Sequence, residues 1–155
     1  MSNRVDFIQL VPEAMTILMT QEDYLQHQFA SSESLSVGIV ELVKLRVSQI
    51  NQCAYCIDMH SKDALKNGET YERMLGLSAW KDMPLFSEQE RNALWWAELV
   101  TLEKVIDEVD YQRVIDCFGE LATVNLTIAI NAINSWNKMV KVFKPQVGYY
   151  HPASS

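Results

Sequence analysis

Apolar residues recur at helical spacing along almost the whole chain. Between residues 39 and 50, isoleucine and valine side chains are separated by one, three or four positions, which places them on one face of a helix. The β-branched run at residues 126–130 is flanked by helix formers and lacks hairpin-turn signals. The pattern predicts an all-α fold, a compact helical bundle with short connections.

About six or seven helices are expected. Gly68 suits the end of one helix, Thr70 the N-cap of the next, and Ser87 with Glu90 forms a capping-box pattern. Asp110 is assigned as the N-cap of a short helix. The expected helical ranges are 12–25, 39–50, 53–67, 70–77, 87–100, 110–118 and 120–143.

The composition is that of one folded domain. The chain has 155 residues, of which 48% are hydrophobic, and we expect a single domain over residues 1–155. The net charge of -7, with no basic stripe, argues against nucleic acid and anionic membranes as partners. No signal-peptide pattern opens the sequence and no apolar run is long enough to cross a bilayer, so a cytoplasmic location is expected.

The chain has three cysteines, Cys53, Cys56 and Cys117. A secreted disulfide scaffold would contain more, usually in an even number. In a reducing compartment, the Cys53-Ala-Tyr-Cys56 pair is typical of a redox or metal site. Cys117 is interpreted as a small buried hydrophobic residue.

The CxxC pair and His60 together favour thiol chemistry. A helix that begins near Cys53 holds both sulfurs in its first turn, where unpaired N–H groups and the helix dipole stabilise a thiolate. His60 follows Cys56 by four residues and so shares its helix face. It could take the Cys56 proton or stabilise the thiolate. A peroxide would convert Cys56 to a sulfenic acid, which Cys53 would resolve as a disulfide.

The cysteine pair also admits other interpretations. Zinc could use the two cysteines and His60, but no second compact ligand pair is present. A distant fourth zinc ligand would have to be His27, Cys117 or His151. Covalent haem requires His directly after the second cysteine, where Ile57 stands, and a thioredoxin fold requires a preceding strand. The plainest alternative is two buried structural thiols with a surface histidine.

Glu41 and the last helix each leave two interpretations open. Glu41 could point inward and orient His60, or it could pair with Lys44 on a solvated face. The helix at 120–143 is apolar on more than one side. It could therefore contact another subunit, or it could be the central helix of the core.

The stretch Glu41-Leu-Val-Lys-Leu-Arg-Val-Ser-Gln-Ile-Asn-Gln-Cys-Ala-Tyr-Cys-Ile-Asp-Met-His-Ser-Lys-Asp-Ala64 resembles the signature of the alkylhydroperoxidase D (AhpD)-like group of the carboxymuconolactone decarboxylase superfamily. The resemblance covers residues 35–142. It implies an AhpD-like all-α fold, homo-oligomers (a dimer, a trimer or a trimer of dimers) and thiol-dependent peroxide reduction. It also implies that Cys56 attacks the peroxide, that Cys53 resolves, and that His60 and Glu41 relay protons.

The sequence departs from this pattern at Tyr55, where the best-studied members of the group carry a second histidine. A phenol does not titrate near neutrality, so the electron donor cannot be carried over. The expected partners are a peroxide and a thiol or dithiol reductant, with a lipoylated or other redox protein as a candidate. No cofactor or metal is expected. A lactone decarboxylase or isomerase and a non-catalytic oligomeric redox sensor remain the alternatives.

Overall fold

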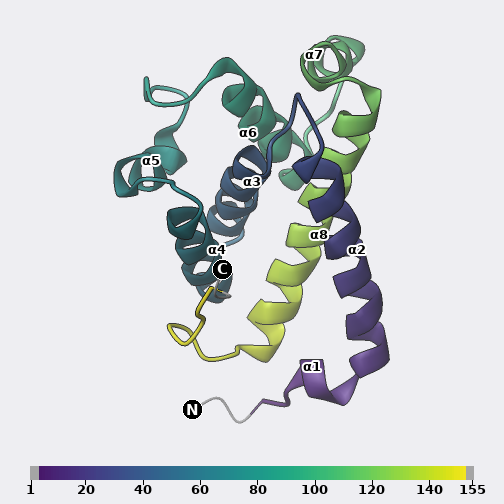
Figure 1. Cartoon of the computed structure of the whole chain (residues 1–155), viewed down its shortest axis with the longest axis vertical. Helices are drawn as coiled ribbons and strands as arrows, with labels where there is room; N and C mark the ends of the chain where they lie inside the picture. Colours follow the sequence, from purple (N-terminus) through teal and green to yellow (C-terminus); the bar gives the residue numbers. More distant parts are fainter. Residues whose placement is uncertain (1–3, 153–155) are drawn as a thin grey trace.

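The computed structural model describes residues 4–152, so residues 1–3 and 153–155 of the expected domain lie outside the described residues. This range is all-α, as predicted, with eight α-helices, one short 3-10 helix and no strand (Figure 1). The α-helices are α1 Phe7–Leu10, α2 Pro12–Ala30, α3 Val37–Ile50, α4 Ala54–Lys66, α5 Tyr71–Gly76, α6 Glu88–Thr101, α7 Glu108–Phe118 and α8 Glu120–Phe143. The 3-10 helix is η1 Leu77–Ala79.

The sequence predicts six or seven helices, and the helix missing from that prediction is α1. It has four residues, which is too short to show periodicity. The caps at Thr70 and Ser87 are confirmed, and Glu90 completes the capping box of α6. The assignment of Asp110 as the N-cap of α7 is wrong. Asp107 is the cap, and Asp110 is the third helical residue, whose side chain accepts from the backbone N–H of Asp107.

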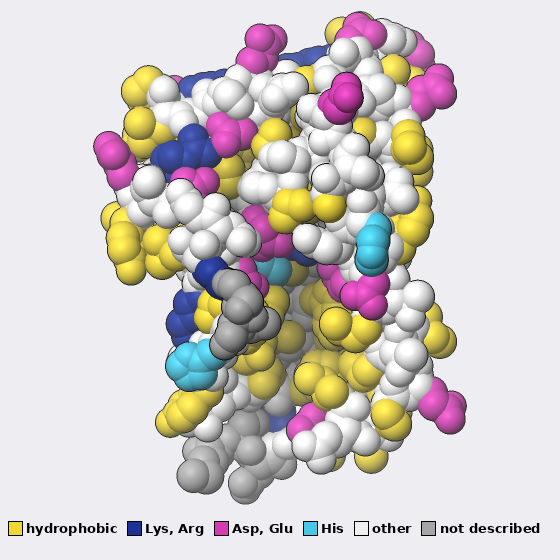
Figure 2. Space-filling view, in the orientation of Figure 1, with side chains coloured by type: hydrophobic (Ala, Val, Ile, Leu, Met, Phe, Trp, Pro, Cys, Tyr) yellow, Lys and Arg dark blue, Asp and Glu magenta, His cyan; other side chains and the backbone are white. Residues whose placement is uncertain are grey.

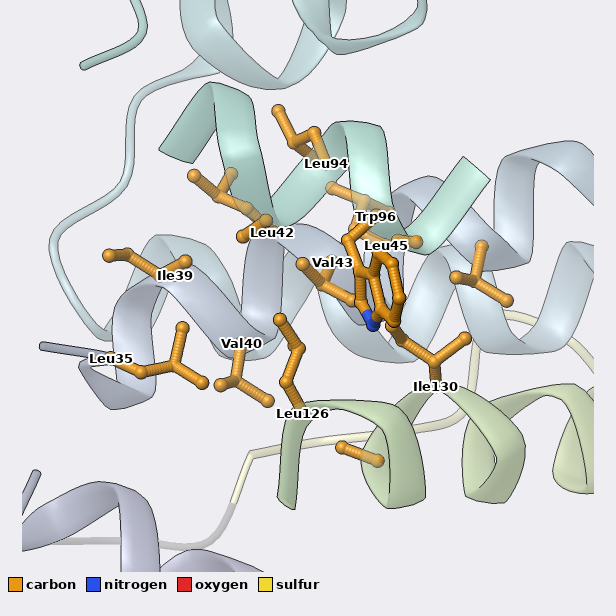
Figure 3. Close-up of a cluster of buried hydrophobic side chains, with 14 of the residues drawn as sticks. Leu35, Ile39, Val40, Leu42, Val43, Leu45, Leu94, Trp96, Leu126 and Ile130 are labelled. Carbon is orange, nitrogen blue, oxygen red and sulfur yellow. The ribbon is translucent and has the colours of Figure 1, made fainter. Parts of the chain in front are cut away.

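Helix α3 lies at the centre of the fold and packs against α4, α6 and α8. Figure 3 shows buried side chains from α3, α6 and α8 meeting in one cluster. Helix α8 packs against α2, α3, α4, α6 and α7, which makes it a central core helix. Leu121, Val124 and Val142 of α8 remain exposed.

A short hydrogen-bonded connection, called the α3–α4 joint below, links α3 to α4. The N–H of Cys53 donates to the carbonyl of Ser48 at 3.0 Å, and the N–H of Gln52 donates to that of Gln49 at 3.1 Å. These two bonds form a Schellman motif, which needs a left-handed residue, and Gln52 supplies it with φ 54. Cys53 is then at once the last residue of this motif and the N-cap of α4.

Polar side chains tie this joint to α8. The amide of Asn51 donates to Asn134 at 2.8 Å and to Asn137 at 2.9 Å. Asn137, which is fully buried, donates to Ser48 at 3.1 Å. Buried polar groups must find partners, so these bonds fix the end of α3 against α8. The position of the CxxC pair therefore depends on both helices.

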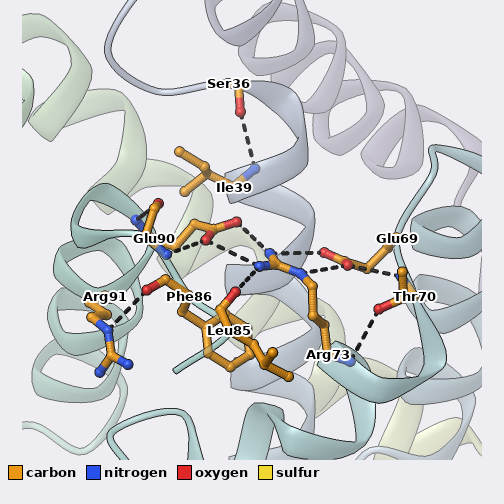
Figure 4. A network of polar contacts seen from close by, with 10 residues as sticks. Ser36, Ile39, Glu69, Thr70, Arg73, Leu85, Phe86, Glu90 and Arg91 are labelled. Carbon is orange, nitrogen blue, oxygen red and sulfur yellow. Dashed lines mark hydrogen bonds and ion pairs between the residues drawn. The ribbon is translucent and has the colours of Figure 1, made fainter. Parts of the chain in front are cut away.

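A second polar cluster joins α5 to α6 (Figure 4). Arg73 donates to both carboxylate oxygens of Glu69, at 2.7 and 3.2 Å, and also to Glu90 and to the carbonyl of Leu85. Its guanidinium lies 4.8 Å from the centre of the Phe86 ring. A fork-shaped cation with this many acceptors fixes the loop before α6 against α5.

The face of the molecule seen in Figure 1 is hollowed in its lower half. Figure 2 shows hydrophobic side chains gathering in this hollow, over α8 and between α4 and α2. The bundle is thus open between α2 and α4, where α8 forms the back of the hollow.

Within residues 4–152, no single helix has the length and apolar character needed to cross a bilayer. Helices α7 and α8 satisfy both criteria only when taken together, and they are bent by 109° at the break between them.

Candidate active site

The two cysteines lie at the start of α4, where the sequence places them. Cys53 is the N-cap, Cys56 lies in the first turn, and their sulfurs are bonded to each other. Both residues are buried, with Val140 of α8 and the partly buried Tyr55 packed against them. Sulfur at this end of a helix meets unpaired backbone N–H groups, so the reduced form of the pair is favoured as a thiolate.

His60 lies one turn beyond Cys56 and is 5% exposed. Its Nδ1 lies 3.1 Å from Oε2 of Glu41 on α3. Its Nε2 is buried and has no hydrogen-bond partner among the described residues. The alternative of structural thiols with a surface histidine does not fit, because this ring is buried and held by a carboxylate.

Glu41 combines both contacts that the sequence left open. It points inward to His60, and its Oε1 lies 3.5 Å from Nζ of Lys44, which also meets Glu22 of α2 at 3.3 Å. Burial alone would raise the pKa of Glu41, but the hydrogen bond from His60 and the charge of Lys44 outweigh it and hold that pKa below its ordinary value. Burial alone would lower the pKa of Lys44. The negative charges of Glu41 and Glu22 outweigh this effect and raise that pKa.

The protonation state of this pair follows from these contacts. An ionised Glu41 can only accept, so Nδ1 of His60 carries the hydrogen and donates it. In a neutral ring, Nε2 is then the basic nitrogen. A buried base that lies one helical turn from Cys56, and whose free nitrogen has no partner in the described part of the chain, is suited to exchange a proton with that thiol.

Glu41 also borders a small cavity. A pocket of about 310 Å³, partly open to solvent, lies between α3, α4 and α5. It is lined by Gly38, Glu41, Leu42, Ala64, Asn67, Gly68, Glu69, Thr70 and Arg73. Glu41 therefore contacts His60 and also lines this partly polar pocket.

The sequence did not single out Asp63 or Tyr150. One oxygen each of Glu41 and Asp63 and one ring nitrogen of His60 lie within 4.8 Å of one another. The Tyr150 hydroxyl lies 2.8 and 3.0 Å from the two carboxylate oxygens of Asp63. Asp63 follows His60 by three residues on α4, a spacing that could have indicated a shared face. No local pattern could have placed Tyr150 there.

The other candidates for metal or thiol chemistry lie elsewhere in the fold. Cys117 lies on α7 beside Asn92 and is only half-buried, so the expectation of a buried residue is met in part; burial raises the pKa of its thiol. Nδ1 of His27 contacts the carbonyl of Asp23 within α2. Neither contact brings a further zinc ligand to the cysteine pair.

Comparison with known proteins agrees with this architecture. The model of the carboxymuconolactone decarboxylase family matches residues 17–99. The uncharacterized protein YdfG of Bacillus subtilis (strain 168) is 42% identical over 142 residues, which are 90% of this chain and 92% of YdfG.

Solved structures extend the comparison. The protein of unknown function ATU0492 from Agrobacterium tumefaciens, described as a candidate antioxidant defence protein AhpD, matches with a TM-score of 0.82 and 32% identity over 97% of this chain and 99% of that one. A peroxidase-related protein from Ralstonia eutropha JMP134, described as an alkylhydroperoxidase AhpD core, matches with a TM-score of 0.78 over 92% of this chain and 74% of that one. Its 16% identity shows likeness of fold alone.

The helical fold and the matched region define the class: the chain belongs to the carboxymuconolactone decarboxylase family. Within the superfamily it is an AhpD-like member, as its match to ATU0492 and the CxxC pair at the start of α4 indicate.

Proposed function

We propose that this protein is a thiol-dependent peroxidase that reduces hydrogen peroxide or organic hydroperoxides through a Cys53–Cys56 disulfide cycle. The observation that carries the proposal is the arrangement of His60. Its Nδ1 contacts Glu41, while Nε2 is buried without a hydrogen-bond partner within residues 4–152, and His60 shares the helix face of Cys56. Such a base activates a thiol and then returns the proton to a leaving group.

The first step oxidises Cys56. Nε2 of His60 takes the thiol proton, and the thiolate attacks one peroxide oxygen. The S–O bond forms as the O–O bond breaks, and the departing alkoxide or hydroxide takes the proton from His60 and leaves as alcohol or water. Cys56 becomes a sulfenic acid, oxidised by two electrons.

The second step resolves the sulfenic acid. The sulfur of Cys53 attacks that of Cys56, and the S–S bond forms as the S–O bond breaks. The hydroxyl leaves as water, with the proton of the Cys53 thiol. The Cα atoms of the two cysteines lie 5.3 Å apart, within the range that a disulfide requires. Fast resolution protects Cys56 from irreversible over-oxidation.

A dithiol closes the cycle. One of its thiolates attacks the disulfide to give a mixed disulfide, and its second thiol releases the reduced pair. The sum is peroxide plus dithiol giving alcohol, water and an oxidised dithiol. A thiol-bearing redox protein, with a lipoylated protein as one candidate, is the proposed donor. Assembly as a homo-oligomer is proposed with it.

Steady-state peroxide consumption with a dithiol reductant tests the proposal. The expected result is turnover that Cys56→Ser abolishes and that Cys117→Ser leaves unchanged, because Cys117 lies on α7 away from the pair. Full activity in Cys56→Ser would disprove it. Lactone turnover in a variant lacking both thiols would instead support a decarboxylase, and slow disulfide formation without turnover would support a redox sensor.

A further inference from the structure

The C-terminal segment turns back onto α4 after α8 ends. Figure 1 shows residues 144–152 leaving the end of α8 and returning to lie beside α4. Nζ of Lys62 donates to the carbonyls of Gly148 at 3.2 Å and Tyr150 at 3.0 Å. Gly148 has φ 96, a conformation open to glycine, and so permits the turn. The segment therefore has a defined anchor on α4.

This anchor places the hydroxyl group of Tyr150 beside the candidate site. The Tyr150 hydroxyl bonds to Asp63, the residue after the anchoring lysine. Burial, the hydrogen bond to Asp63 and the negative charges of Asp63 and Glu41 raise the pKa of Tyr150 to about 12. The phenol therefore keeps its proton and remains a donor over the physiological range.

Two carboxylates lie close to one histidine. Glu41 and Asp63 both have an oxygen within 4.8 Å of a ring nitrogen of His60, yet Nδ1 has a single hydrogen to donate. That hydrogen is directed to Glu41 at 3.1 Å. Asp63 instead accepts the hydroxyl of Tyr150, which contacts both of its oxygens.

We propose that Tyr150 is a positioning residue that holds Asp63 away from His60 and so reserves Nδ1 of His60 for Glu41. The inference deepens the proposed function and rests on it for its catalytic meaning. Without the phenol, Asp63 turns toward His60 and competes with Glu41. Both the weaker hydrogen bond and the nearer like charge then raise the pKa of Glu41.

The surroundings of Glu41 define what else could move that pKa. Its titratable neighbours are Lys44 on α3, backed by Glu22 of α2; His60 and Asp63 on α4; Tyr150 on the C-terminal segment; and Glu69 and Arg73 across the pocket. Tyr55 on α4 acts on Tyr150 rather than directly on Glu41. Among these, the substitution Tyr150→Phe alters one hydroxyl and no formal charge. It therefore isolates the proposed contact.

A carbon-13 NMR titration of the Glu41 carboxyl group in the full chain, in its disulfide form, tests the inference. Glu41→Gln assigns the signal. Tyr150→Phe is expected to move the titration midpoint upward, with about tenfold tighter proton binding. Tyr149→Phe is the matched control, because Tyr149 is 70% exposed, and it should leave the midpoint unchanged.

A double-variant comparison separates positioning from a general structural effect. In an Asp63→Asn background, Tyr150→Phe should not move the Glu41 midpoint further, because no second carboxylate is left to compete. An unchanged midpoint in Tyr150→Phe, or an equal upward shift in the Asp63→Asn background, overturns the inference. The readout does not depend on turnover. If the wild type shows no peroxidase activity, the proposed function is refuted. If Tyr150→Phe still shifts the midpoint of Glu41, the positioning role stands.

Discussion

Nδ1 of His60 lies 3.1 Å from Oε2 of Glu41, and this contact joins α4 to α3 inside the fold. It has two consequences for the candidate site. It fixes which ring nitrogen faces away from Glu41, and it places an ionised carboxylate behind the ring. Such a carboxylate holds the ring in one orientation and so directs its free nitrogen.

The Glu41–His60 contact predicts that removing the negative charge of Glu41 strongly slows the reaction with peroxide. Glu41→Gln keeps the size of the side chain but no longer stabilises a charged ring. We expect the second-order rate of peroxide-driven disulfide formation to fall about 10- to 100-fold. The loss of free thiols with time gives this rate. Glu33→Gln, on the loop before α3, is the control, and an unchanged rate in Glu41→Gln would remove Glu41 from the relay.

The ion pair with Lys44 predicts a pH dependence. Lys44→Met removes a positive charge 3.5 Å from Glu41, so the pKa of Glu41 rises. The acid limb of the rate profile should then move to higher pH, because Glu41 is protonated sooner as pH falls. Lys66→Met, at the far end of α4, should leave the limb in place. A limb that stays fixed in Lys44→Met would contradict the assignment of that limb to Glu41.

The same contacts predict how stability depends on pH. The folded pKa of Glu41 lies below its unfolded value, so the stabilisation is present above the ordinary carboxylate range and is lost as pH falls through the folded pKa. Urea unfolding of the wild type should therefore show a loss of stability on acidification. Glu41→Gln should show a smaller loss, and an equal loss in both proteins would argue against a depressed pKa.

The left-handed residue between α3 and α4 predicts a stabilising substitution. Gln52 has φ 54, which costs a residue with a side chain about 1 kcal/mol. Gln52→Gly should therefore raise the free energy of unfolding by up to about 1 kcal/mol. Gln49→Gly, inside α3, should lower it by a similar amount. Chemical denaturation measures both, and destabilisation by Gln52→Gly would show that its side chain has another role.

The packing of Val140 predicts how access to the disulfide is controlled. Val140 is 9% exposed and packs against the buried cysteine pair. Val140→Ala should open a path and speed reduction of the disulfide by a dithiol several-fold, at a cost of about 1–2 kcal/mol of stability. Val142→Ala is the control, because Val142 is 56% exposed. Equal reduction rates in the two variants would mean that Val140 does not limit access.

Local signals were sufficient for most of the fold. The range 120–143 matches α8 because Gly119 precedes it and Pro145 follows it. Asp107 and Asp110 are three residues apart and reciprocal in the capping box, so the sequence did not show which one is the cap. Helix α1 was missed because one turn carries no periodicity. These differences concern one cap and one four-residue helix, and they leave the architecture unchanged.

The candidate site was predictable only where its residues share a helix. Cys53, Cys56 and His60 follow from their spacing on α4. Glu41 was assigned through the family resemblance, since a contact between helices depends on packing. Tyr150 could not be foreseen, because its place depends on the path of a segment without regular structure.

The central claim is that Cys56 attacks the peroxide and Cys53 resolves the sulfenic acid. Trapping that sulfenic acid tests the claim most directly. Cys53→Ser treated with one equivalent of hydrogen peroxide should carry a sulfenate-specific diketone on Cys56, located by peptide mass spectrometry. The matched Cys56→Ser protein should carry none on Cys53. An adduct on Cys53 in Cys56→Ser, with none on Cys56 in Cys53→Ser, would contradict the account and reverse the two roles.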